Sequence, residues 1–297
     1  MMKHKSYTVA AIGCTGHITE LFLKEFSKQP INLRVLARKP AQFLERYPNV
    51  EIVEGSMLNV NDLQKVLQGV DAAFVVTPMG TRNNKTPEVE AAKCVIEAAK
   101  AANLKHFIYV SVLGTDKPRG LSIFDAKYDI EKLLAESGLG WTAIRCGSYM
   151  EDVFDPRLSA IKKGVFLFPV KKSSRFTYTP QADIPHFVVE ELINSNRILN
   201  CGFNFVSKGT YSIREIEQLL SQIRGKRVKA TGSFPLLCIL ILLMPYFIAS
   251  NHRFSTIVPL LRYFNKYGYI DDVKTVSELF PSFKITSLEE HLQKVLK

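Results

Sequence analysis

The sequence lacks the cysteine patterns of a disulfide framework or a zinc site. Its five cysteines are scattered and odd in number, and no two of them form a C-x-x-C pair. Small disulfide-rich domains and zinc sites need paired or clustered cysteines, so both classes are excluded. The pattern fits a reducing compartment, and we expect a cytoplasmic protein.

Long hydrophobic runs are also scarce. The basic start, Lys3 to Lys5, is followed by an apolar run that is too short for the core of a signal peptide. The uncharged run Phe234–Ala249 is interrupted by Pro235 and Pro245 and is shorter than the roughly 18 to 20 apolar residues of a spanning helix. A transmembrane helix is therefore not expected.

Acidic residues are missing between Glu217 and Asp271, although the chain has a formal net charge of +11. Two interpretations fit the apolar run inside this stretch. It is buried as a helix, lid or dimer face, or it dips into a membrane surface while cations within residues 224–266 meet anionic headgroups. No recognised nucleic-acid motif accompanies the positive charge, so we expect no nucleic-acid partner.

A glycine turn near the N-terminus is the most informative feature that is present. The apolar run Val9–Ile12 leads into Gly13 and Gly16, and a helical pattern opens near His17. Strand, glycine turn and helix in this order form the phosphate-binding part of a dinucleotide-binding unit. The pyrophosphate lies on the free N–H groups at the start of the helix. The third glycine of the usual fingerprint is replaced by Thr19.

Two cations follow the second predicted strand, at residues 33–37. A carboxylate at this strand tip binds the ribose 2′-hydroxyl of NAD, whereas here the positions hold Arg38 and Lys39. A guanidinium grips a phosphate bidentately, and an ammonium adds a point charge. The pair favours NADP(H) over NAD(H); an ordinary solvated pair at a strand end is the alternative.

Strands and helices alternate through the first half of the chain, which predicts an α/β fold with a doubly wound parallel sheet of the Rossmann type. Ligands of such sheets lie outside the carboxyl ends of the strands. Gly13, Arg38, Ser56, Thr77 and Ser111 follow or end five of these strands. The expected strands cover residues 9–12, 33–37, 50–54, 72–76, 106–111 and 141–145. The expected helices begin near residue 17, at residue 59 or 61, and near residue 87, and a further helix is under way at residue 124.

Several motifs together resemble the NmrA-like family, an atypical branch of the short-chain dehydrogenase/reductase superfamily. They are GCTGHIT, LARKP, GVDAAFVVTP, HFIYVSVLG, the run K-x-x-x-E-K-L-L-x-x-S-G-L-x-W-T-x-I-R from Lys127, and SYME. The resemblance covers about residues 7–195. It implies an NAD(P)-binding Rossmann core over residues 1–155, with 175–205 returning to it. Residues 156–174 and 206–297 would then form a smaller substrate or lid domain.

The resemblance also implies site residues. The phosphate-loop positions of the family match Gly13, Thr15, Gly16, His17 and Ile18, and its 2′-phosphate position matches Arg38. Ser56 stands where the family commonly has Asp after Gly. Members of the family are NADPH-dependent reductases or non-catalytic sensors that bind NADP.

The proton-donating Tyr-x-x-x-Lys pair of typical short-chain dehydrogenases is incomplete. Ile123 occupies the position four residues before Lys127. Lys127 is a candidate to bind the nicotinamide ribose, to act as an acid or base if burial depresses its pKa, or to lie on the surface. Ser111 lies where the superfamily places its catalytic serine, although a hydroxyl satisfied within the protein is the alternative. Tyr149 is expected to line the nicotinamide side of the cleft.

A second pair of polar residues lies in the segment Gln181–His186. Asp183 and His186 together would suit acid–base chemistry. The segment resembles a strand-to-helix junction of the family, and we interpret Asp183 as a helix cap.

These features predict an NADPH-dependent oxidoreductase that acts on a hydrophobic acceptor such as a quinone. A quinone needs no protein acid, because solvent can protonate the reduced product. The alternatives are a non-catalytic NADP(H) sensor that acts through a protein partner, and a peripheral membrane variant.

Overall fold

Seven short segments form one sheet in which every neighbouring pair of strands is parallel. The computed structural model describes residues 7–13, 17–38, 47, 50–77, 87–155, 160–231, 253–270 and 275–296. The strand order is β11–β6–β5–β4–β1–β2–β3, which confirms the doubly wound fold. The order reverses between β1 and β4, the kind of position at which doubly wound sheets bind their ligands. The strands are β1 (Tyr7–Ile12), β2 (Ile31–Ala37), β3 (Val50–Glu54), β4 (Ala72–Val75), β5 (His106–Val112), β6 (Trp141–Cys146) and β11 (Cys201–Phe205).

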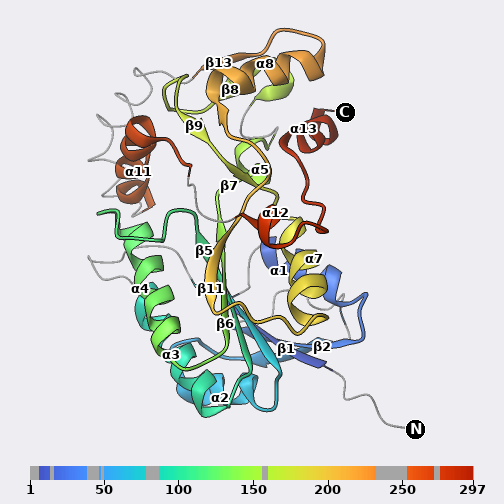
Figure 1. The fold of residues 1–297 in the computed structure, drawn as a ribbon, viewed down its shortest axis with the longest axis vertical. Coiled ribbons are helices and arrows are strands. Elements are labelled where there is room, and N and C mark those ends of the chain that lie inside the picture. Colours follow the sequence, from blue (N-terminus) through green and yellow to red (C-terminus); the bar gives the residue numbers. More distant parts are fainter. Residues whose placement is uncertain are drawn as a thin grey trace.

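Helices cover both faces of this sheet (Figure 1). Val9 and Ala11 of β1 belong to one apolar cluster, and Ala10 and Ile12 belong to another on the opposite face. Since both faces are buried, the central strands read as continuous apolar runs rather than as alternating patterns. The first face is covered by α1 (His17–Phe26), α7 (Asp183–Phe187) and the π-helical turn η3 (Val188–Ile193). The second is covered by α2 (Val60–Leu67), α3 (Pro87–Ala101) and α4 (Ser122–Glu136).

Local signals set the ends of these helices. The Asn59 side chain accepts the backbone N–H groups of Asn61 and Asp62 and so caps α2. Gly69, just past the end of α2, and Gly138, just past the end of α4, have φ of +70° and +78°. Glycine is the residue that adopts this left-handed conformation without strain, so it ends both helices.

A third apolar cluster lies beyond the carboxyl ends of the strands, in the upper part of Figure 1. Three two-stranded ladders, β10–β7, β12–β9 and β13–β8, support it. Its elements are β7 (Ser148–Tyr149), α5 (Met150–Val153), η2 (Ile161–Lys163), β8 (Val165–Leu167), β9 (Arg175–Phe176), β10 (Tyr178–Thr179), β12 (Tyr211–Ser212), α8 (Ile213–Arg224), β13 (Lys229–Thr231), α11 (Arg253–Tyr267) and α13 (Leu288–Leu296). The short helix α12 (Val276–Leu279) packs against the first cluster instead.

Asp183 fastens the C-terminal segment to α7. Its carboxylate accepts the Thr286 backbone N–H at 2.7 Å and the Thr286 hydroxyl at 3.0 Å. Asp183 is the first residue of α7, and the residue before it makes no side-chain cap bond. The prediction that Asp183 caps its helix is therefore wrong. His186 turns away to Glu25, at 3.3 Å, so the two residues have separate structural partners.

The Phe234–Ala249 run lies outside the described residues. Among the helices that are described, none is long and apolar enough to cross a bilayer. Two of the flanking cations, Arg262 and Lys266, are exposed on α11.

Candidate functional site

The turn after β1 can hold only glycine at its first position. Gly13 has φ of +78°, and a Cβ there would overlap the carbonyl oxygen of Val76, just past the end of β4. The same Cβ would lie 2.9 Å from the terminal methyl group of Met57. Bare backbone is thus packed between the loops after β3 and β4 and leads into the first turn of α1. A glycine that makes the tight turn between the first strand and helix is the first part of the dinucleotide-binding fingerprint.

Arg38 and Ser56 lie at the ends of the next two strands. Arg38 follows β2 and is exposed. The Gly55 N–H donates to the Ala37 carbonyl at 2.9 Å, which ties the end of β3 to the residue before Arg38. The Ser56 N–H donates to Asp62 at 3.0 Å, and its hydroxyl oxygen accepts the Leu58 N–H at 3.2 Å. Ser56 therefore shapes the turn, and Arg38 is exposed directly after β2.

The predicted phosphate loop is described only in part. Thr15, Gly16 and Lys39 lie outside the described residues. The backbone of His17 and Ile18 opens α1, as the sequence predicts, but their side chains are not described. The roles of these five residues stay predictions.

The side chain of Lys127 is buried between α4 and the sheet. Its Nζ lies 2.9 Å from a Glu88 carboxylate oxygen and donates to Thr77 Oγ1 and to the Val110 carbonyl, each at 3.0 Å. The same ammonium lies 4.7 Å from the centre of the Tyr109 ring. Thr77, Glu88, Tyr109 and Lys127 are each at most 3% exposed. Lys127 is therefore half of a buried ion pair, and each of its three ammonium protons has an acceptor.

The hydroxyl of Thr77 sets the direction of the hydrogen bonds in this cluster. It donates to Glu88 at 2.7 Å, so its oxygen accepts from Lys127 and from the Tyr109 hydroxyl, at 3.0 Å. Burial by itself would lower the pKa of Lys127, but Tyr109 and Glu88 outweigh it and raise the pKa. The condition for acid–base work, a depressed pKa at Lys127, is thus not met. Burial also raises the pKa of Tyr109 to about 12.

Ser111 is hydrogen-bonded to a second buried ion pair, which Glu131 forms with Arg145. Its hydroxyl donates to a Glu131 carboxylate oxygen at 2.6 Å, and the Thr115 hydroxyl donates to the same atom at 2.6 Å. Arg145 of β6 binds both oxygens of Glu131, with distances of 2.7 to 3.1 Å. This geometry favours the interpretation of Ser111 as a hydroxyl satisfied within the protein. Lys127 and Glu131 are four residues apart, so one face of α4 carries both charges against the sheet.

Tyr149 lies in β7, next to the end of β6. It is half-buried, and burial together with the neighbouring Cys146 raises its pKa well above the ordinary value. The Tyr269 hydroxyl donates to the Cys146 carbonyl at 3.2 Å, so the two tyrosines meet at the end of β6. Tyr269 lines the cavity described next, and Tyr149 does not. The predicted contact between Tyr149 and a nicotinamide stays a prediction.

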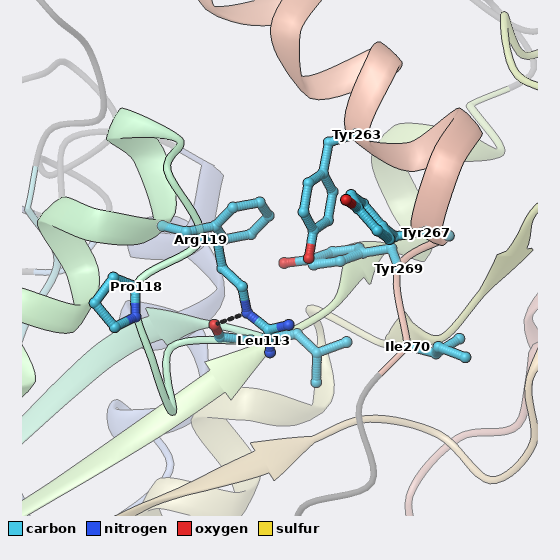
Figure 2. A pocket seen from close by; sticks show the side chains of 10 residues that line it. Leu113, Pro118, Arg119, Tyr263, Tyr267, Tyr269 and Ile270 are labelled. Carbon is cyan, nitrogen blue, oxygen red and sulfur yellow. Dashed lines mark hydrogen bonds between the residues drawn. The ribbon is translucent and has the colours of Figure 1, made fainter.

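A cavity of about 300 Å³ opens past the carboxyl end of β5 (Figure 2). Leu113 and Gly114 follow β5 directly, and Phe124 comes from the first turn of α4. The Tyr263 ring lies 5.4 Å from the Phe124 ring and 5.0 Å from the Tyr267 ring, so the wall is aromatic. The other lining residues are Pro118, Arg119, Gly268, Tyr269 and Ile270.

No motif in the sequence led us to expect this cavity. The described aromatic wall comes from α11 and the residues after it. A signal was present: Tyr263 and Tyr267 are four residues apart and share one helix face, and Tyr269 follows directly after Gly268. The other wall is formed by residues more than 130 positions earlier, and spacing alone does not reveal such a partner.

Gly268 turns the chain from α11 into the cavity wall. It has φ of +73°, and a Cβ there would lie 2.6 Å from the Arg175 carbonyl oxygen, which accepts the Tyr269 N–H at 2.8 Å. We expect Gly268→Ala to lower the free energy of unfolding by about 2 to 5 kcal/mol, about 1 to 2 from the left-handed backbone and the rest from the overlap. Urea denaturation measures this loss.

The matched control is Gly225→Ala at the end of α8. Gly225 has a similar φ of +65°, but a Cβ there would meet nothing within 4 Å. We expect the control to lose only the backbone contribution, about 1 to 2 kcal/mol. Equal losses in the two variants would show that the Arg175 carbonyl does not restrict position 268.

The chain is similar to proteins of known family and fold. The model of the NmrA-like family matches residues 5–292. The NAD(P)H azoreductase of Xenophilus azovorans is 24% identical, over 74% of this chain and 75% of its own. The Photosystem II assembly factor Ycf39 of Cyanophora paradoxa is 23% identical, over 75% of this chain and 71% of its own. The crystal structure of the NADPH-dependent quinone oxidoreductase of Escherichia coli with NADPH has a TM-score of 0.75, 21% identity, and coverage of 97% of this chain and 100% of that one.

Proposed function

The chain belongs to the NmrA-like family, and we propose that it is an NADP(H)-dependent oxidoreductase that reduces a hydrophobic acceptor such as a quinone. The observation that carries the proposal is the aromatic cavity at the carboxyl end of β5, on the same edge of the sheet as the Gly13 turn. Ligands of doubly wound sheets bind along this edge. Two relatives whose names specify NAD(P)H azoreductase and NADPH-dependent quinone oxidoreductase support the same class of reaction.

The residues present fit a dinucleotide. Gly13 lets β1 turn closely past the Val76 carbonyl toward the start of α1, where a pyrophosphate would lie, and exposed Arg38 offers a cation to a 2′-phosphate. When bound, the nicotinamide would supply a hydride. The chain would hold the nucleotide with the loops after β1, β2 and β3, and Thr77 at the end of β4 is already engaged by Lys127.

The chemistry of the site favours an acceptor that needs no protein acid. The position four residues before Lys127 is Ile123, and Lys127 keeps its proton within the buried ion pair. The Ser111 hydroxyl donates its hydrogen bond to Glu131. Reduction of a carbonyl group by the usual Tyr–Lys route therefore lacks its donor, whereas a reduced quinone takes its proton from water.

Cofactor choice can be tested at Arg38. We expect Arg38→Ala to weaken NADPH binding by about tenfold to a hundredfold, because a charge-assisted phosphate contact contributes about 1.5 to 3 kcal/mol. NADH lacks the 2′-phosphate, so its affinity should not change. Fluorescence titration of both proteins with both nucleotides measures this. An equal loss for NADPH and NADH would contradict a contact between Arg38 and the 2′-phosphate.

The reductase proposal is tested by steady-state oxidation of NADPH with a panel of quinones. We expect turnover above the background rate. No turnover with any quinone, in a protein that binds NADPH, would contradict it.

A second candidate is a non-catalytic NADP(H)-responsive protein that acts through a protein partner. The likeness to a Photosystem II assembly factor favours this class. Nucleotide-dependent recovery of a partner in a pull-down, without turnover, would support it over the reductase.

A peripheral membrane contact through residues 224–266 is tested by flotation with anionic liposomes, which should depend on the Phe234–Ala249 run.

A further inference from the structure

Arg119 extends from the loop before α4 into the aromatic cavity (Figure 2). Its Nε donates to the Gly114 carbonyl at 2.9 Å, and its Nη2 donates to Asp116 Oδ1 at 2.7 Å. Its backbone N–H donates to Asp125 at 2.7 Å, and the Gly120 N–H donates to the same oxygen at 3.1 Å. Both ends of the residue are therefore fixed by the protein, and the guanidinium needs little ordering when a ligand binds.

The rings around Arg119 suit a flat ligand. Tyr263 is half-buried and Tyr267 is 57% exposed, so the aromatic wall runs from the interior to the mouth of the cavity. The Tyr269 ring lies 5.8 Å from the Phe124 ring. Aromatic side chains bind planar rings by offset stacking and edge contacts, and a cavity of about 300 Å³ is at the lower end of small-molecule sites.

Building on the proposed reductase function, we propose that this cavity binds a planar aromatic acceptor and that the Arg119 guanidinium contacts the acceptor oxygen on which negative charge develops. Arginine keeps its proton at all physiological pH values, so Arg119 stabilises that charge and does not donate the proton. Reduction of a quinone adds two electrons and two protons. The hydride brings both electrons and one proton, and water supplies the second. Arg119 thus takes the electrostatic part of the role that the absent tyrosine has in typical short-chain dehydrogenases.

A substitution at Asp116 should strengthen the binding of an anion, whereas a substitution at Arg119 should weaken it. Its carboxylate partly neutralises the guanidinium, through the contact at 2.7 Å. Asp116→Asn keeps an oxygen that accepts from Arg119 and removes the negative charge. The guanidinium should then attract an anionic ligand more strongly, because less of its charge is compensated.

The test is calorimetric titration with two probes and no nicotinamide nucleotide. One probe is 2-hydroxy-1,4-naphthoquinone, an anion at neutral pH, and the other is uncharged 1,4-naphthoquinone. We expect Arg119→Gln to weaken binding of the anion by about 10- to 100-fold, as for loss of a charge-assisted hydrogen bond. Binding of the uncharged probe should weaken by less than about threefold. Asp116→Asn should bind the anion a few-fold more tightly than the unmodified protein does.

The matched control is Lys117→Gln, which removes one positive charge from the same loop. Lys117 is exposed, lies 3.9 Å from the same Asp116 carboxylate and does not line the cavity. We expect this variant to change the affinity for the anion by less than about threefold. An effect as large as that of Arg119→Gln would overturn the proposal, as would an equal loss of both probes in Arg119→Gln.

If Arg119→Gln does not fold, the Asp116→Asn variant tests the proposal instead. Unchanged or weaker binding of the anion to that variant overturns the proposal. Because the probes are titrated without nucleotide, the result is independent of turnover. Arg119-dependent anion binding without quinone reduction would contradict the reductase function and leave the cavity assignment standing. Quinone reduction without Arg119-dependent anion binding would contradict the cavity assignment and leave the reductase function standing.

Discussion

Lys127→Met should lower the free energy of unfolding by about 3 to 5 kcal/mol, because it leaves the Glu88 carboxylate buried without its cation. The loss is measured by urea denaturation. The matched control on the same helix is Lys132→Met. The Lys132 side chain is 62% exposed and pairs with Glu136 at 4.0 Å, so its loss should stay within about 0.5 kcal/mol.

The double variant Lys127→Met with Glu88→Leu tests whether the unpaired Glu88 carboxylate causes the loss of stability. Removing both charges should restore most of the lost stability, since a buried ion pair is often replaced by apolar groups at little cost. A different outcome would argue for another role: if Lys127→Met leaves stability unchanged and weakens NADPH binding, Lys127 acts on the nucleotide and not in the buried cluster.

Gly13→Ala should abolish measurable NADPH binding, a loss of more than about a hundredfold, and lower the free energy of unfolding by about 2 to 5 kcal/mol. The left-handed backbone at φ of +78° contributes about 1 to 2 kcal/mol, and the overlap of the new Cβ with the Val76 carbonyl contributes the rest. The overlap forces the ends of β1 and β4 apart at the point where the pyrophosphate would lie. Fluorescence titration with NADPH and urea denaturation measure the two effects.

Gly69→Ala is the control for the backbone contribution. Gly69 has φ of +70°, follows α2 and has open space around a new Cβ. It should lose about 1 to 2 kcal/mol and keep full affinity for NADPH. Retention of NADPH binding by Gly13→Ala would show that this turn does not hold the phosphates.

The central sheet could be predicted from the sequence because its signals are local. Val9–Ile12 and Ala72–Val75 are apolar runs without alternation, as strands buried on both faces must be. Asn59 and Gly69 mark the two ends of α2 by hydrogen bonding and by backbone conformation, and both effects depend only on neighbours in the chain.

The surroundings of the candidate residues could not be predicted in the same way. The sequence places Lys127 on a helix and Ser111 at a strand end, but their charged partners are distant in sequence. Glu88 comes from α3, and Glu131 is matched to Arg145 across two elements. Whether a lysine is free to meet a ligand or neutralised in the interior depends on these partners.

The position of β11 has a consequence for synthesis on the ribosome. This strand pairs with β6 and forms the edge of the main sheet, although more than 50 residues separate the two in sequence. At about 5 to 20 residues per second, the wait between them is about 3 to 11 seconds. During that time the buried, apolar β6 has an open edge to which another nascent chain can add a strand. We therefore expect the unfinished chain, and not the completed protein, to be the form that depends on chaperones.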